Sequence, residues 1–151
     1  NSNSVVDHLP EVKGKWISIG RLDLNTSGLI LFTNNGDLAN KIMHPSNKFD
    51  REYIVETDKP ISQDSMMALL KGVPINDGQI GKFNHISKIR TKTYSVTLST
   101  GKNREIRNSL TQVKIKTISL KRIRYSKILI GDLKPGEYRN LNILERASFS
   151  I

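Results

Sequence analysis

Short apolar runs alternate along this chain with polar stretches that are rich in turn-forming residues. The runs at 16–19 and 29–32 predict two buried strands. The polar loop between them begins at Gly20 and ends at Gly28, and glycine permits backbone angles that other residues resist. The pattern therefore predicts a loop held firmly at both ends, and we expect the rest of the chain to support it.

Alternation of apolar and polar residues continues further along the chain and predicts a sheet. In the stretch 94–99, Tyr94, Val96 and Leu98 alternate with small hydroxyl residues, which predicts a half-buried antiparallel strand. The remaining strands are expected at 51–56, 82–89, 116–125 and 141–144.

Helix signals lie between the predicted strands. The clearest helix covers 62–71, where Ser62 is the candidate N-cap and Gly72 follows the last turn. Asp37 is the candidate cap of a shorter helix that ends at Pro45, and further helices are expected at 5–9 and through 106–113. The sequence has no internal repeat, low-complexity block or linker, so it predicts one α+β domain over 1–151.

Charge changes this picture more than composition does. The net charge is +10 and the isoelectric point lies near 9.9, which favours a polyanionic partner. Nucleic acid is the favoured partner and an acidic membrane surface the lesser one, with a bias toward lysine-rich composition as the alternative explanation. Basic clusters at 88–92, 102–107 and 114–124 stand beside turns and on strands, which favours a basic groove along a phosphate backbone.

Several classes of site and location are excluded or disfavoured. The chain has no cysteine and only three histidines, so disulfides and thiolate metal sites are excluded and we expect no metal site. Neither a run long enough to span a membrane nor a signal segment is present. We therefore expect no membrane partner.

Asp23 is the candidate reactive group. It is the only carboxylate in the loop 20–28, and Arg21 precedes it by two positions. An aspartate on a strand-supported loop suits a nucleophile or a base, although many such residues only cap turns. The residue pattern alone leaves both interpretations of Asp23 open, a reactive carboxylate and a turn cap.

Several motifs follow one another in order along the chain. They are Gly20-Arg21-Leu22-Asp23, Thr26-Ser27-Gly28-Leu29, Thr33-Asn34-Asn35-Gly36, Leu38-Ala39-Asn40-Lys41-Ile42-Met43-His44-Pro45-Ser46, Arg51-Glu52-Tyr53 and Gly101-Lys102-Asn103-Arg104-Glu105-Ile106-Arg107. Together they resemble the bacterial ribosomal pseudouridine synthases, which comprise type A for small-subunit RNA and types B, E and F for large-subunit RNA. The motif sequences are most similar to those of the pseudouridine synthase B branch, and the resemblance covers nearly the whole chain.

The resemblance implies a role for each matching residue. Asp23 resembles the catalytic aspartate, Tyr53 the tyrosine that stacks on the flipped uracil, and Arg107 the basic residue that pairs with the aspartate. The aspartate would attack uracil C6 or ribose C1′, or take part in proton removal at C2′. The expected substrate-binding residues are Arg21, Leu120, Arg104, Lys102 and Asn103.

The resemblance also implies a fold, a substrate and a setting. The expected fold is a mixed, mainly antiparallel sheet with flanking helices and a central basic cleft. We expect a specific uridine of 23S-type ribosomal RNA as the substrate, free or in a pre-ribosomal particle, with no cofactor. A monomer is expected, in the cytoplasm or in an organellar matrix. The N-terminal RNA-binding domain and first catalytic strand of family members are not found before Val5, so only the catalytic domain is expected.

Two alternatives differ in class from this reading. One is an inactive RNA-binding module or ribosome-assembly factor, which the joint presence of Asp23, Tyr53 and Arg107 disfavours. The other is a hydrolase of an acidic substrate that uses Asp23, for which the sequence offers neither a paired carboxylate nor a metal cluster.

Overall fold

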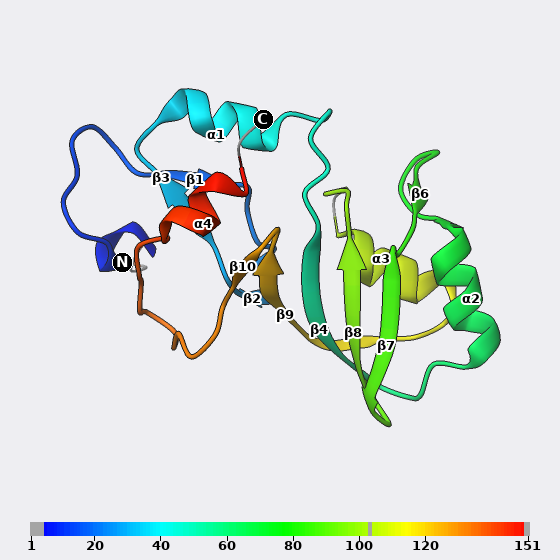
Figure 1. The fold of residues 1–151 in the computed structure, drawn as a ribbon. Coiled ribbons are helices and arrows are strands. Elements are labelled where there is room, and N and C mark those ends of the chain that lie inside the picture. Colours follow the sequence, from blue (N-terminus) through cyan, green and yellow to red (C-terminus); the bar gives the residue numbers. More distant parts are fainter. Residues whose placement is uncertain (1–4, 103, 150–151) are drawn as a thin grey trace.

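The computed structural model describes residues 5–102 and 104–149, and its centre is a mixed, mainly antiparallel sheet (Figure 1). This arrangement confirms the predicted fold class. The short strand β2 (Thr26–Gly28) pairs with β9 in parallel, and the other pairs of the sheet are antiparallel. The remaining strands follow the order β10 (Ile128–Leu129), β9 (Thr117–Tyr125), β4 (Arg51–Thr57), β8 (Thr93–Leu98) and β7 (His85–Arg90).

Strand β8 lies inside this sheet and is buried on both faces, so the predicted half-buried strand is wrong in that respect. On the face of the sheet opposite to that of Tyr94, Val96 and Leu98, the hydroxyl of Ser95 donates a hydrogen bond of 2.7 Å to the carboxylate of Glu52. The other oxygen of that carboxylate accepts a hydrogen bond of 2.9 Å from Arg124. Ser95 is thus bonded to a member of an ion pair, a long-range contact that alternation alone does not reveal.

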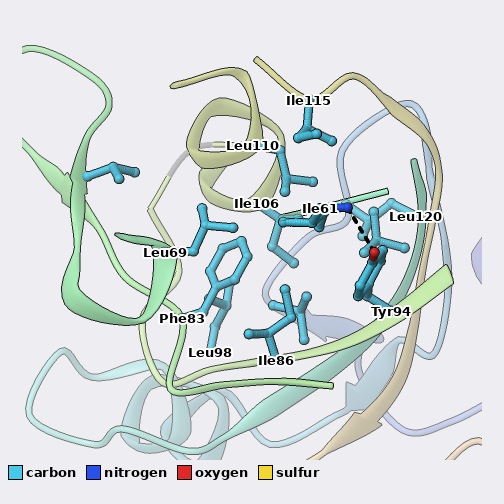
Figure 2. Packing of buried hydrophobic residues seen from close by; sticks show 13 residues of the cluster. Ile61, Leu69, Phe83, Ile86, Tyr94, Leu98, Ile106, Leu110, Ile115 and Leu120 are labelled. Atoms are coloured by element: carbon cyan, nitrogen blue, oxygen red, sulfur yellow. Dashed lines mark hydrogen bonds between the residues drawn. The ribbon is translucent and has the colours of Figure 1, made fainter. Parts of the chain in front are cut away.

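Two helices pack against the sheet, as the sequence predicts. Helix α2 (Gln63–Lys71) begins after Ser62, whose side chain accepts a hydrogen bond from the Ser65 amide, and ends at Gly72. Helix α3 (Glu105–Gln112) lies behind β8 and β7 in the view of Figure 1. Between these helices and the sheet, Leu69 and Leu110 pack with the buried face of β8 (Figure 2). The hydroxyl of Tyr94 accepts a hydrogen bond of 2.8 Å from the amide of Ile61 in this core.

A second, smaller core gathers around the strands β1 (Ile17–Ile19) and β3 (Leu31–Thr33), which pair antiparallel as predicted. Helix α1 (Gly36–Met43) covers them (Figure 1). Its N-cap is Asn35, whose side chain accepts a hydrogen bond from the Leu38 amide. The predicted cap, Asp37, lies inside the first turn instead, where a carboxylate still favours the helix dipole.

The chain ends differ in their agreement with the sequence pattern. The expected helix at 5–9 is a single 3-10 turn, η1 (Val5–His8). The expected strand at 141–144 is wrong, because the chain there forms helix α4 (Ile143–Ala147). Asn142 and Glu145 cap each other's backbone at its first turn, and this reciprocal capping outweighs the apolar run.

A further small hairpin consists of β5 (Val73–Pro74) and β6 (Ile80–Gly81). No helix in the described parts of the chain is long and apolar enough to cross a membrane.

The loop 20–28 contains the strand β2, where the sequence pattern predicts irregular backbone only. Gly28 lies opposite Arg122 of β9, and the amide of Leu29 donates a hydrogen bond of 2.9 Å to the Arg122 carbonyl. A Cβ added at Gly28 would overlap that carbonyl oxygen and lie 2.6 Å from the Arg122 nitrogen. Glycine is therefore required by close backbone approach as well as by its φ of +115°.

We expect Gly28→Ala to lower the free energy of unfolding by more than about 3 kcal/mol, because backbone must shift to admit the methyl group. Gly20→Ala is the matched control in the same loop. Gly20 has a φ of +78° and open space around its Cβ position, so about 1 kcal/mol is expected there. Urea unfolding followed by circular dichroism measures both, and equal losses would contradict the close-approach argument.

Candidate active site

One pocket of about 870 Å³ lies where the loop 20–28 meets the central sheet. Strands β4 and β9 form one wall, and the segment that leads into α3 forms another. Seven basic side chains line it, whereas Asp23 and Glu105 are the acidic ones among its described lining residues. The basic residues are Arg21, Lys48, Arg51, Lys102, Arg104, Arg107 and Arg122. The pocket therefore has the electrostatic character of an anion-binding cleft.

Asp23 begins a tight turn in which its carbonyl accepts a hydrogen bond of 2.9 Å from the Thr26 amide. Among the residues that the structure describes, none donates a hydrogen bond to the Asp23 carboxylate. The carboxylate is half-buried and lines the pocket. Its oxygens are therefore available to a bound molecule.

Arg107 holds the turn from the first part of α3, though less directly than expected. Its guanidinium donates a hydrogen bond of 2.6 Å to the backbone carbonyl of Asn25. Within the described chain no ion pair of 4.0 Å or less joins Arg107 to Asp23. The expected pairing of Arg107 with the carboxylate is therefore replaced by a hydrogen bond to the loop backbone. Burial lowers the pKa of Arg107, the charge of Arg104 lowers it further, and the charge of Asp23 opposes both.

Tyr53 and Leu120 face the same pocket from adjacent strands. Sequence alone did not place Tyr53 and Asp23 together, and the structure does so because β2 joins the loop to β9. Leu120 lies opposite Val55 in the ladder, two positions from Tyr53. An aromatic ring and an aliphatic side chain thus form apolar walls inside a basic rim, which suits a flat, partly polar ligand.

Two arginines that line the pocket, Arg51 and Arg122, had no site role predicted from the sequence, although Arg51 stands in a family motif and Arg122 in a basic cluster. Arg51 stands two residues before Tyr53, and Arg122 two residues after Leu120, so strand alternation places each pair on one face. Alternation was the signal that would have found them. Both guanidinium groups lie over the ring of Tyr125, at 5.0 and 5.2 Å from its centroid.

A register shift between β4 and β9 decides which arginine enters the pocket. Glu52 pairs with Arg124, whereas Tyr53 pairs with Arg122, so one residue of β9 is left over as a bulge. Arg124 consequently points to the opposite face, where it binds Glu52. The predicted basic cluster 114–124 is therefore divided between the two faces of the sheet.

The buried carboxylate of Glu105, which is 3% exposed, holds Thr100 and Lys102 at the entry to α3. Its oxygens accept hydrogen bonds from the Thr100 hydroxyl and from the amides of Lys82 and Lys102, at 2.9 to 3.3 Å. Arg104 adopts a left-handed conformation (φ 50°, ψ 37°) as the chain enters α3. A non-glycine residue in that region is strained, and such strain often occurs at functional sites.

The structure separates the remaining predicted binding residues. Arg21, Lys102 and Arg104 line the pocket, and Arg21 is exposed at its rim. Asn103 lies outside the described residues. The basic cluster 88–92 lies at the turn between β7 and β8, at the far end of the hairpin from the pocket segment 98–102 (Figure 1). The pocket therefore includes residues of the clusters 102–107 and 114–124 but none of the cluster 88–92.

Known proteins match this chain in sequence over most of its length. Residues 6–112 match the family model described as RNA pseudouridylate synthase. A protein named Ribosomal large subunit pseudouridine synthase B from Buchnera aphidicola is 43% identical over 145 residues, covering 91% of this chain and 58% of the relative. The protein of the same name from Yersinia pestis is 42% identical and covers 93% of this chain and 46% of its own. This chain spans about half the length of the curated relatives it matches.

A solved structure described as a pseudouridylate synthase matches the fold with a TM-score of 0.90 at 22% identity. The match covers 97% of this chain and 65% of that protein. At that identity the likeness concerns the arrangement of helices and strands alone.

We expect Glu105→Gln to destabilise the segment 100–105, because an amide places a donor against groups that already donate. The loss in the free energy of unfolding should be about 1–3 kcal/mol. Glu56→Gln changes an exposed carboxylate on β4 and should stay within about 0.5 kcal/mol of the parent. Thermal unfolding gives both values, and hydrogen exchange should rise across 100–105 only in the first variant. Equal exchange in the two variants would show that Glu105 does not hold the segment.

Proposed function

Because this chain belongs to the RNA pseudouridylate synthase family, we propose that it converts a uridine of large-subunit ribosomal RNA to pseudouridine. In this proposal Asp23 is the catalytic carboxylate and Tyr53 contacts the target base. The names of the relatives at 43% and 42% identity support RNA of the large ribosomal subunit as the substrate. We propose RNA as the partner on the same grounds, and the basic rim of the pocket supports it.

One observation carries the assignment of Asp23. Asp23 and Glu105 are the two carboxylates among the described lining residues. The Asp23 carboxylate accepts no hydrogen bond from any described residue, whereas the Glu105 carboxylate accepts hydrogen bonds from two backbone amides and a hydroxyl. Glu105 is thereby committed to structure. This arrangement disfavours a hydrolase with paired carboxylates, since the second group is not available for acid–base work.

The reaction itself is an isomerisation and needs neither oxidant nor water. The bond between C1′ and N1 of uridine breaks, and a bond between C1′ and C5 forms in its place. The proton on C5 leaves and N1 gains a proton, so atoms and charge balance. Attack of Asp23 at C6 or at C1′, and proton removal at C2′, all require a carboxylate that reaches the nucleoside inside a pocket that excludes water.

The arrangement also supports a way to hold the target base. A uridine within a helix is inaccessible to Asp23, so it must leave the stack and enter the pocket. Tyr53 and Leu120 present the apolar surfaces that a uracil ring would occupy, and Arg21 and Arg104 lie where its phosphates would approach. We propose Lys102 and Arg107 as further members of this substrate-binding set.

The first test replaces Asp23 with Asn, an isosteric amide that is a poor nucleophile. Pseudouridine formation in unmodified large-subunit ribosomal RNA should fall by more than about a thousandfold, while RNA affinity changes little. Asp64→Asn, an exposed carboxylate on α2, is the control and should keep full activity. Tritium release from 5-labelled uridine measures the rate. A comparable rate in the Asp23→Asn variant would remove Asp23 from the mechanism, and binding without any turnover by the parent chain would support the inactive-module alternative.

The second test separates support from RNA contact at Arg107. Arg107→Met should lower the single-turnover rate at saturating enzyme by 10- to 100-fold, on the order of 1.4–2.8 kcal/mol, because it frees the Asn25 carbonyl and the Asp23 turn. Arg107→Lys should recover part of the rate, since a point charge reaches the carbonyl without the planar fork. Arg90→Met, at the distant hairpin, should leave the rate unchanged. Weaker binding with an unchanged rate would make Arg107 a phosphate contact only.

A further inference from the structure

The guanidinium group of Arg122 is a buried cation at the back of the pocket, and Arg122 is 2% exposed. Burial lowers its pKa, the neighbouring Tyr53 opposes that lowering most, the charge of Arg51 adds to the lowering, and Tyr125 opposes it. Among the described residues no carboxylate lies within 4.0 Å of it. A buried charge without a counter-ion is costly, so stability alone would favour an apolar side chain at this position.

Arg122 joins two parts of the site that come from different elements. Its Nε donates a hydrogen bond of 2.8 Å to the carbonyl of Leu29, directly after Gly28. The amide of Leu29 donates in return to the Arg122 carbonyl at 2.9 Å. On the adjacent strand Tyr53 lies opposite Arg122, and both residues line the pocket. Arg122 thus holds the exit of the Asp23 loop and is the cross-strand neighbour of the tyrosine of β4.

The surroundings of Arg122 keep this group in one orientation. The ring of Tyr125 lies 5.2 Å from the guanidinium carbon, and Arg51 approaches the same ring at 5.0 Å. The Nη2 atom is buried and makes no hydrogen bond with a described residue. Because solvent does not reach that atom, Arg122 is unsuited to direct contact with RNA, and its effect must pass through the groups it holds.

We propose that Arg122 is a positioning residue that fixes the Tyr53 side chain relative to the Asp23 loop. This inference rests on the proposed pseudouridine synthase activity. Without the guanidinium, Tyr53 and the loop exit lose their common anchor, and the two groups no longer meet the same nucleoside in a fixed geometry. Small displacements of this kind lower rates more than they lower affinity.

The test compares Arg122→Met with Arg124→Met. Both variants remove a guanidinium from β9, but Arg124 faces the opposite side of the sheet and binds Glu52. We expect Arg122→Met to lower the single-turnover rate on ribosomal RNA at least tenfold, with RNA affinity unchanged within twofold. Arg124→Met should retain the parent's rate on bound RNA. A full rate in the Arg122→Met variant would overturn the proposal.

A double-mutant cycle shows whether the effect passes through Tyr53. Tyr53→Phe keeps the ring and removes the hydroxyl, the polar group through which a guanidinium could orient this side chain. We expect the loss from Arg122→Met to shrink several-fold in the Tyr53→Phe background, because the group that it positions is already absent. If the rate of the double variant is lowered by the product of the two single losses, Arg122 acts independently of Tyr53, and the proposal is contradicted.

Two further measurements keep the inference separable from the proposed function. Should Arg122→Met not fold, Arg122→Lys replaces it under the same criteria, with an expected partial loss of rate. Should the parent chain form no pseudouridine, the proposed function fails, and amide exchange then tests the anchor alone. Exchange across 26–29 should rise in the Arg122 variant and not in Arg124→Met, and unchanged exchange would overturn the positioning role.

Discussion

The backbone of Gly28 lies directly against the backbone of Arg122, and the site depends on this contact. The loop with Asp23 belongs to the small layer of β1, β3 and α1, whereas Tyr53 and Leu120 belong to the central sheet. The parallel pairing of β2 with β9 joins the two layers. The pocket lies at that joint, so its geometry follows from how closely two backbones can approach.

Charge is distributed over the sheet by the same strand that receives the loop. Because β9 contains a bulge, Arg122 faces the pocket and Arg124 faces away from it. Arg124 meets a carboxylate, as charged residues at partly exposed positions commonly do. Arg122 instead meets a backbone carbonyl and an aromatic face, neither of which neutralises it. The sheet thus places its unpaired guanidinium on the side of the pocket and its ion pair on the opposite side.

Much of the fold follows from local pattern, and the differences arise where long-range contacts decide. The strands at 17–19, 51–57 and 93–98 and the helix after Ser62 were predictable from alternation and capping. Strand β2 has no periodic pattern of its own, since it consists of Thr26, Ser27 and Gly28 and exists through its partner. Helix α4 was predictable in principle, because Asn142 and Glu145 stand at capping-box spacing, but the apolar run 141–144 resembled a strand. The family motifs indicated Asp23, Tyr53 and Arg107, whereas the carbonyl contact of Arg107 depends on three-dimensional geometry.

The contacts that close the loop also set an order for folding. The hydrogen bonds from Arg107 to Asn25 and from Arg122 to Leu29 join residues 82 and 93 positions apart. Contacts of such separation form late, because a long segment must be ordered before they become favourable. During synthesis the Asp23 loop leaves the ribosome well before its partners on α3 and β9. A nascent chain that ends before Arg122 therefore contains the reactive carboxylate but lacks the strand that gives the loop its shape.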